Sequence, residues 1–232
     1  MSARRQTVSL AWPPRDRGEL QAFPHTVLAE DRDLWRVVGN GRGPWWFNGS
    51  GHGRFDLREP EGTCYLATDE LSALLEAVGP DRLGGAVSTS FLDARHLRRL
   101  RPPRPLSLAD LTSRRASGFG FTLEIHTIVP YDLPQAWAAS LRDAGAAGLL
   151  YFVRHDPAAG HGVAIFGRQG ERTSWARGRG QPIGPPLAER LEKECGISVI
   201  AVPRLDQLRI ARGLRRAREA SGAALRVLPA VR

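Results

Sequence analysis

The sequence predicts a single α+β domain with mixed or antiparallel sheets and flanking helices. Strand-like and helix-like segments follow one another without the strict alternation of a doubly wound fold. In addition, 42% of the 232 residues are hydrophobic, which is enough to bury a substantial core as one domain. We expect an irregular lead-in over residues 1–30, the domain over residues 31–203, and a basic C-terminal extension over residues 204–232.

Several segments have the composition of β-strands. The first, residues 34–38 (LWRVV), has Arg36 at its centre, and residues 63–67 (TCYLA) alternate around Tyr65. Residues 39–53 between them form a loop rich in glycine and aromatic residues, a composition typical of loops that wrap a ligand or seal a core edge. Further strands are expected at residues 106–111, 148–153, 162–167 and 196–202.

Helices are predicted where apolar residues recur with a period near 3.6. Residues 69–78 (DELSALLEAV) place three leucines and Val78 on one face, and Thr68 or Asp69 can cap the first turn. Three more helices are expected, at residues 91–100, 133–145 and 205–220, the last of them basic. Residues 121–129 have no clear assignment.

Composition narrows the class of protein. No run approaches the ~20 apolar residues that span a bilayer, and the first residues lack the apolar block of a signal peptide, so a cytoplasmic protein without a membrane partner is expected. Cys64 and Cys195 suggest neither a disulfide framework nor a zinc site, and His155 and His161 lack a third defined ligand, so no metal is expected. The net charge of +9 comes almost entirely from arginine, with Lys193 the one lysine, and no aromatic residues interleave a basic motif, so nucleic acid is an unlikely partner.

A series of short motifs resembles the RES domain, a family named for Arg, Glu and Ser. They are LWRVV with Arg36, the FN pair at Phe47, GRFDL from Gly53, GTCYLA from Gly62, ALLE ending at Glu76, ADLTS around Thr112, and GLLYFVRHDP followed by GVAIFG. The resemblance runs in order from about residue 34 to residue 167, with a weaker continuation to about residue 203. It implies a fold similar to ADP-ribosyltransferases.

The same resemblance implies a function. Characterised RES proteins are toxins that degrade NAD+ by hydrolysis or phosphorolysis of the bond between nicotinamide and ribose, and a partner antitoxin holds them inactive. NAD+ would be the substrate, and no separate cofactor is expected. By match to the motifs, the catalytic residues would be Glu76, Arg36 and Tyr65, and the residues that bind NAD+ would be Arg36, Arg54, Tyr65, Phe47 and Arg154.

Cleavage of the bond between nicotinamide and ribose requires residues of these types, independently of the family resemblance. Breaking the nicotinamide bond develops positive charge on the ribose, which a fixed carboxylate such as that of Glu76 stabilises. The pyrophosphate of a dinucleotide suits the planar fork of arginine, so Arg36 and Arg54 are candidates. The flat ring of Tyr65 can stack on nicotinamide.

Pattern alone gives each residue an ordinary interpretation too. Glu76 lies off the centre of the apolar stripe, so periodicity predicts a solvated surface glutamate. Tyr65 fits a core edge and Arg54 a loop charge. Arg36 is the least ordinary, because a guanidinium in an apolar strand must find an anionic partner or a ligand.

One position departs from the family pattern. The family serine falls at Val153, whose side chain can neither donate nor accept a hydrogen bond. Either its role passes to Arg154, His155 or a water, or this branch has lost or altered the activity.

The sequence therefore leaves three functions open. The first is NAD+ cleavage, with the chain as the toxin of a toxin–antitoxin pair. The second is a catalytically silent module that binds NAD+, ADP-ribose or a protein, and the third is protein ADP-ribosylation. An antitoxin is the expected protein partner, and a homodimer is the default oligomer.

Overall fold

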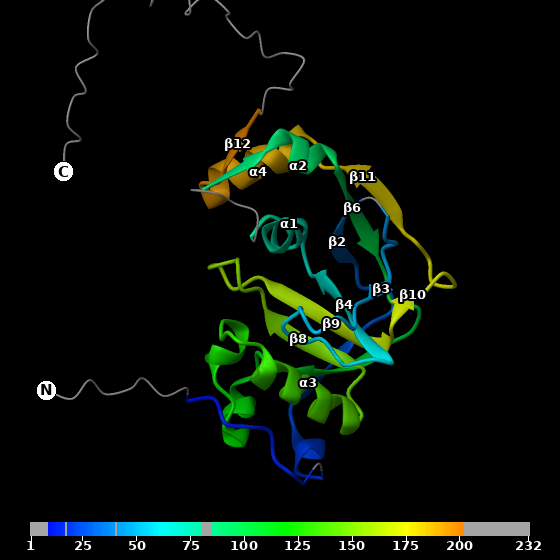
Figure 1. Ribbon diagram of the computed structural model, residues 1–232, viewed down its shortest axis with the longest axis vertical. Helices are drawn as coiled ribbons and strands as arrows, with labels where there is room; N and C mark the ends of the chain where they lie inside the picture. The colour runs from blue at the N-terminus through cyan, green and yellow to red at the C-terminus, as the bar shows by residue number, and fades with distance from the viewer. Residues whose placement is uncertain (1–8, 17, 40, 80–84, 202–232) are drawn as a thin grey trace, which may run out of the picture. The chain divides into compact units, whose positions relative to one another are not determined.

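The computed structural model describes residues 9–16, 18–39, 41–79 and 85–201 (Figure 1). Helices and strands are mixed along the chain without strict alternation, which confirms the predicted α+β class. The strands are β1 (His25–Leu28), β2 (Leu34–Gly39), β3 (Trp46–Phe47), β4 (Glu61–Ala67), β5 (Ala86–Ser88), β6 (Arg95–Leu100), β7 (Leu106–Asp110), β8 (Gly148–Phe152), β9 (His161–Arg168), β10 (Gly170–Glu171), β11 (Arg179–Pro182) and β12 (Ser198–Ile200). The α-helices are α1 (Glu70–Val78), α2 (Thr89–Asp93), α3 (Asp132–Asp143) and α4 (Pro185–Cys195), and the 3-10 helices are η1 (Glu19–Ala22), η2 (Arg114–Phe119) and η3 (Leu123–His126).

One eight-stranded sheet has the order β1-β7-β8-β9-β4-β2-β6-β11. Neighbouring strands run antiparallel, except that β7 and β8 are parallel. Two small sheets, β10 with β3 and β12 with β5, lie outside it. The mixed sheet with flanking helices is the arrangement that the sequence predicts.

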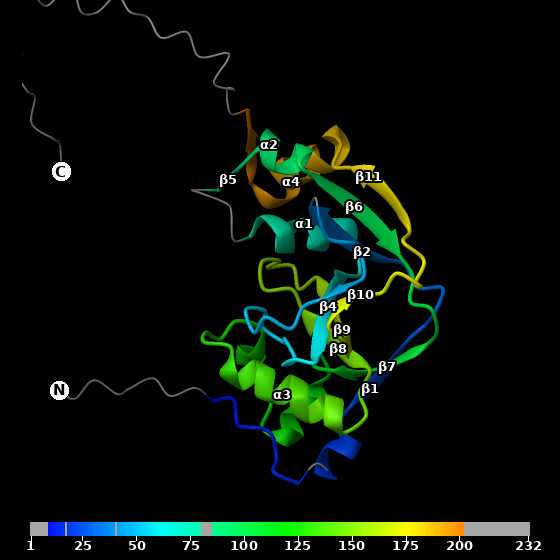
Figure 2. The same ribbon diagram turned by 45° about the vertical axis from the view of Figure 1, so that its right-hand side comes forward.

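Helices cover the two halves of the sheet separately. Figures 1 and 2 show α3 beside β8 and β9, and α1, α2 and α4 grouped near β2 and β6. On the α3 side, Phe23, Phe121 and Trp137 pack with ring centroids 5.2 to 6.0 Å apart. On the α1 side, the buried leucines of α1 meet Leu97 of β6 and Leu191 of α4. No helix within the described ranges is long and apolar enough to cross a membrane.

The segment predicted as one helix over residues 91–100 is instead α2 followed by β6. Leu97 and Leu100 are three residues apart, which imitates a helical face. In the structure they lie on opposite faces of a strand and enter different core clusters. Pairing with β2 on one side and β11 on the other outweighs the helical pattern.

The lead-in expected to be irregular contributes to the fold. Within residues 1–30, η1 buries Leu20 completely, and β1 pairs with β7 at one edge of the sheet. Strand β12 is shorter than the expected strand over residues 196–202, and α4 had no counterpart among the predicted helices. The basic helix expected over residues 205–220 lies outside the described residues.

Candidate active site

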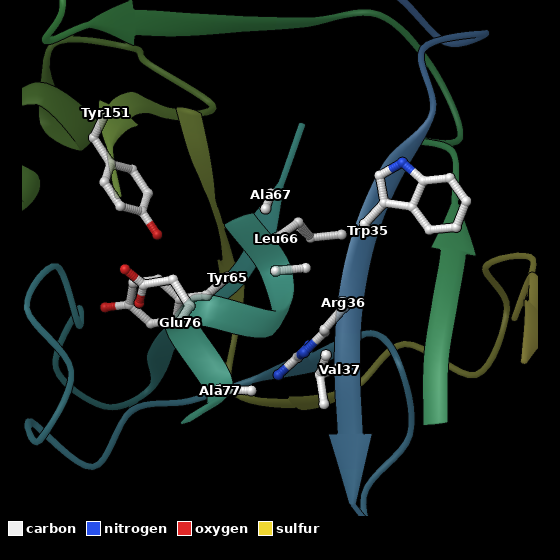
Figure 3. Close-up of a pocket in the computed structure, with 10 residues that line it drawn as sticks. Trp35, Arg36, Val37, Tyr65, Leu66, Ala67, Glu76, Ala77 and Tyr151 are labelled. Atoms are coloured by element: carbon white, nitrogen blue, oxygen red, sulfur yellow. The ribbon is translucent and has the colours of Figure 1, made fainter. Parts of the chain in front are cut away.

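Two strands diverge at the centre of the large sheet. Strand β2 pairs with β6 over six positions and β4 pairs with β9 over seven, but β2 and β4 share a single pair, Trp35 with Ala67. Strand pairing between the two halves of the sheet is therefore limited to one residue pair. A cavity of about 260 Å³ lies at this fork, between β2, β4 and α1 (Figure 3). Its lining residues are Trp35, Arg36, Val37, Tyr65, Leu66, Ala67, Ala73, Glu76, Ala77 and Tyr151.

A second cavity, of about 270 Å³, adjoins the first. Its lining residues are His52, Gly53, Arg54, Phe55, Tyr65, Glu76, Tyr131, Tyr151, Arg154 and His155. Tyr65, Glu76 and Tyr151 line both cavities, and Figure 3 shows the Glu76 carboxylate and the Tyr151 hydroxyl directed toward each other. One carboxylate is thus accessible from two adjoining spaces.

Glu76 is positioned by the helix that begins immediately after β4. Of the two residues that the sequence offered as caps, Asp69 caps α1 by accepting a hydrogen bond from the backbone N–H of Ser72 at 2.8 Å. The Glu76 carboxylate is half-buried, and its Oε1 accepts a hydrogen bond from the backbone N–H of Arg154 at 3.2 Å. The solvated position that the periodicity predicts is wrong, because the loop after β8 folds over this side of α1.

Burial raises the pKa of Glu76 above its ordinary value. The Arg154 amide and the charges of Arg54 and Arg154 oppose this rise. A carboxylate in such surroundings responds strongly to a positive charge beside it, because little water is present to screen the interaction.

Tyr65 is fixed by a buried carboxylate. Its hydroxyl donates to Oδ1 of Asp56 at 2.9 Å and accepts from the backbone N–H of Phe55 at 2.8 Å. Asp56 is 1% exposed and also accepts from Nδ2 of Asn48 at 2.7 Å and from the backbone N–H of Gly53 at 2.9 Å. Burial, followed by the Asp56 charge, raises the pKa of Tyr65 well above its usual range. Tyr65 therefore presents a neutral, immobilised ring to both cavities.

Arg54 is a buried cation with an incomplete set of hydrogen bonds. Its Nη1 donates to the carbonyl oxygens of Ile128 at 2.7 Å and Ile125 at 3.3 Å, and its guanidinium carbon lies 4.7 Å from the centroid of the Tyr131 ring. Its Nη2 is buried and has no partner among the described residues. Burial lowers the pKa of Arg54, while the nearby Tyr131 and Glu76 oppose the shift. A buried N–H without a partner, beside a cavity, is a donor available to a ligand.

Arg36 holds the loop that follows β2. Its Nη1 donates to the carbonyl oxygens of Pro44 at 2.7 Å and Trp46 at 3.1 Å, and it contacts Sγ of Cys64 at 3.0 Å. Within the described ranges it forms no ion pair with a carboxylate. The partner that a buried guanidinium requires is supplied here by backbone carbonyls, and the side chain also lines the first cavity.

Two residues that the motifs suggest as NAD+ contacts, Phe47 and Arg154, differ in their positions relative to the cavities. Phe47 is completely buried, packs edge-on against Trp175 and lines neither cavity, because its strand directs it into the core. We therefore omit Phe47 from the proposed substrate contacts. Arg154 lines the second cavity with an exposed side chain, whose Nη1 is 3.4 Å from the hydroxyl of Tyr131.

Val153 is a packing residue. Its side chain is 3% exposed and lines neither cavity, and its backbone N–H donates to the carbonyl oxygen of Gly160 at 2.8 Å. The residue that follows it, Arg154, supplies the amide that holds Glu76. This contact comes from the backbone, so it does not depend on the side chain at position 153.

Sequence reasoning missed Tyr151 and Tyr131. Tyr151 is 4% exposed and lines both cavities, and burial, followed by the charge of Glu76, raises its pKa well above the usual range. The available signal was a polar-tipped ring in the otherwise apolar strand GLLYF. Tyr131 lies in a segment without a clear pattern, and no signal in the sequence pointed to it.

Comparison with known proteins agrees with this architecture. The RES domain family model matches residues 33–179, which is more than half of the chain, and the chain belongs to this family. Its fold is similar to that of a chain in the crystal structure of the M. tuberculosis MbcT-MbcA toxin-antitoxin complex. The TM-score is 0.56 at 18% sequence identity, with 75% of this chain and 94% of that chain covered. No curated protein matches this sequence.

Proposed function

We propose that this protein cleaves NAD+ at the bond between nicotinamide and ribose, and that it is the toxin of a toxin–antitoxin pair. The observation that carries the proposal is the half-buried carboxylate of Glu76, which two adjoining cavities share. Membership of the RES family supports it, as does the fold similarity to a chain of a toxin-antitoxin complex.

The size and charge of the two cavities suit a dinucleotide. Each is slightly smaller than the lower end, about 300 Å³, of ordinary ligand pockets, whereas the two together fall well within that range. The unpartnered Nη2 of Arg54 supplies a buried donor to a phosphate oxygen in the second cavity. Arg36 places a second positive charge at the first cavity.

The proposed reaction needs one anionic group beside the ribose. As the bond between C1 of the ribose and the nicotinamide nitrogen breaks, its electron pair leaves with nicotinamide, which becomes neutral. The positive charge moves to the ribose, and the Glu76 carboxylate stabilises it. Water or phosphate then attacks C1. Attack by water, which loses a proton, gives ADP-ribose. Attack by phosphate gives ADP-ribose that carries a phosphate on the same C1.

The two tyrosines that share the wall with Glu76 have supporting roles in this scheme. Their raised pKa values keep both hydroxyls neutral, so neither places a negative charge beside the carboxylate. Tyr65, held by Asp56, offers a ring on which nicotinamide can stack as it leaves.

Val153 favours a second candidate function. With valine in place of the family serine, the chain could bind NAD+ or ADP-ribose in the same cavities without turnover. In a third candidate, protein ADP-ribosylation, the acceptor is a protein side chain, and mass spectrometry of an incubated lysate would detect the added ADP-ribose.

The deciding experiment follows free nicotinamide by chromatography after the purified protein is incubated with NAD+, with and without phosphate. We expect release that falls by at least about a hundred-fold in Glu76→Gln, because the charge that stabilises the ribose is lost. Glu70→Gln, on the same helix but lining neither cavity, is the matched control and should retain activity. NAD+ binding by calorimetry without nicotinamide release would replace cleavage with the silent-module function.

A further inference from the structure

A third cavity, of about 410 Å³, lies apart from the candidate active site. It is formed by the end of β2, the loop that follows it, β6, and the residue two positions before β11. Its lining residues are Val38, Gly39, Gly41, Arg42, Gly43, Pro44, His96, Arg98 and Arg177. None of these lines either of the cavities that share Glu76, so the space is a separate one.

The lining carries three arginines and no acidic residue. Arg42 lies over the ring of Trp46, 5.4 Å from its centroid, and Nη1 of Arg98 donates to the carbonyl oxygen of Gly178 at 3.3 Å. Nε of Arg98 is buried without a partner, and none of Arg42, Arg98 and Arg177 forms an ion pair within the described part of the chain. Three unneutralised guanidiniums around one space repel one another unless an anion lies between them.

Two arginines that follow Arg98 in the chain, Arg99 and Arg101, are neutralised by a carboxylate. Asp33 pairs with Arg99 at 2.5 Å and Arg101 at 2.7 Å, and these two arginines hold the pKa of Asp33 at about 2. Along β6 the side chains alternate, so Arg98 projects from the face opposite to Arg99. The Glu171 carboxylate lies behind Gly43, where an added Cβ would meet it, and its Oε1 accepts from the backbone N–H of Trp45 at 3.3 Å.

The backbone is open at two of the three glycines that line this cavity. At Gly39 and Gly41 an added Cβ would meet no atom within 4 Å, so the lack of a side chain is not a packing requirement there. Gly41 has a φ of +96°, which favours glycine, but Gly39 has no such constraint. Neither packing nor backbone conformation requires glycine at position 39, and the open space there allows a bound group to approach the main chain.

We propose that this cavity binds the phosphate groups of a small phosphorylated ligand. Arginine binds phosphate bidentately, and the unpartnered Nε of Arg98 is a donor of this kind. The volume fits a ligand larger than a single oxyanion, and two neighbouring phosphates bridge the three arginines better than one. The diphosphate comes either from a separate ligand or from a dinucleotide that reaches past Arg36, whose Nη1 holds Pro44 at the cavity wall.

The test is calorimetry of the full chain with inorganic pyrophosphate as the probe. We expect the double variant Arg98→Gln, Arg177→Gln to bind pyrophosphate about ten-fold more weakly or worse, because it loses two charge-assisted contacts. Arg177→Gln alone changes an exposed residue, and it should give a partial loss even if the double variant fails to fold. Arg179→Gln removes the same charge from β11 outside the cavity and should change the affinity less than about two-fold.

Equal losses in Arg177→Gln and Arg179→Gln would overturn the proposal, since they would show that net charge alone attracts pyrophosphate. An unchanged affinity in the double variant would overturn it too. Titrating NAD+ into protein saturated with pyrophosphate distinguishes the two sources: competition places the diphosphate of the dinucleotide here, and independent binding indicates a separate ligand. The experiment measures binding, so its result remains valid even if the protein does not cleave NAD+.

Discussion

The ionisation of Glu76 controls the proposed reaction. Burial raises the pKa of this carboxyl above 4.5, and the Arg154 amide and two arginine charges oppose the rise. Only the ionised form stabilises a cationic ribose, so kcat/KM for NAD+ should fall about ten-fold per pH unit below the raised pKa. The acid limb should therefore begin at a higher pH than it would for an exposed glutamate. A profile of nicotinamide release against pH measures it.

A charge variant checks the assignment of that limb. Arg54→Gln removes a positive charge that lowers the pKa of Glu76, so the acid limb should move to higher pH while the overall rate falls. Glu76→Gln should retain only a residual rate without the limb. If the acid limb stays at the same pH in Arg54→Gln, or persists in Glu76→Gln, a group other than Glu76 produces it.

Asp56 acts on the site through Tyr65. It is almost completely buried and accepts hydrogen bonds from the Tyr65 hydroxyl, Nδ2 of Asn48 and the backbone N–H of Gly53. In Asp56→Asn one oxygen becomes a donor that faces another donor, which leaves buried groups unpaired. We expect the free energy of unfolding to fall by about 1–3 kcal/mol, measured by urea denaturation. Asp93→Asn, at an exposed position, is the control and should change it by less than about 0.5 kcal/mol.

The sequence indicated which residues belong to the candidate site more readily than it indicated the burial and contacts of their side chains. Motif order drew attention to Arg36, Arg54, Tyr65 and Glu76, and each of the four lines at least one of the two adjoining cavities. Periodicity placed Glu76 in solvent, since it describes one helix and cannot include the loop that supplies the Arg154 amide. Nor could it show that the FN motif directs Phe47 into the core, because the facing Trp175 is distant in sequence.

At the scale of one element, the cap of α1 connects stability to the site. Asp69 accepts the Ser72 backbone N–H, and the Ser72 hydroxyl lies between Oδ2 of Asp69 at 2.6 Å and Oδ2 of Asp156 at 2.9 Å, in the loop that supplies the Arg154 amide. Asp69→Ala should reduce the free energy of unfolding by about 1 kcal/mol and the Tm by about 2–4 °C, as calorimetry measures. Asp69→Asn retains a capping oxygen and should recover most of this loss. Equal Tm values for the two variants would show that the capping hydrogen bond of Asp69 does not stabilise the protein.

Elements with local signals were predictable, and elements defined by distant partners were not. Helix α1 has a cap and an apolar stripe within its own sequence, and β8 and β9 are short apolar runs. The spacing of Leu97 and Leu100 suits a helix equally well, and only pairing with β2 and β11 makes β6 a strand. Similarly, β1 has an exposed Val27 and little periodicity, so its pairing with β7 has no sequence signature.

At the scale of the whole described unit, the sheet is continuous through one residue pair at the fork. The strand order that creates the fork depends on long-range pairing, and no motif in the sequence specifies it. Each half of the sheet has its own helices, and a third core cluster that contains Leu34, Leu66 and Val163 packs across the fork. A ligand that contacts Arg36 on one side and Arg54 on the other would add a further connection between the halves.

This geometry predicts that substrate binding stabilises the whole unit. In Glu76→Gln, where NAD+ should bind without turnover, NAD+ at about 100 times its Kd should add about 2.7 kcal/mol to the free energy of unfolding. For a domain of this size the Tm should rise by about 5–10 °C, which scanning calorimetry detects. Adding Arg54→Gln to this variant removes the buried donor and should abolish most of the rise at the same NAD+ concentration. A Tm that does not respond to NAD+ at any concentration in Glu76→Gln would mean that the two cavities do not bind the dinucleotide.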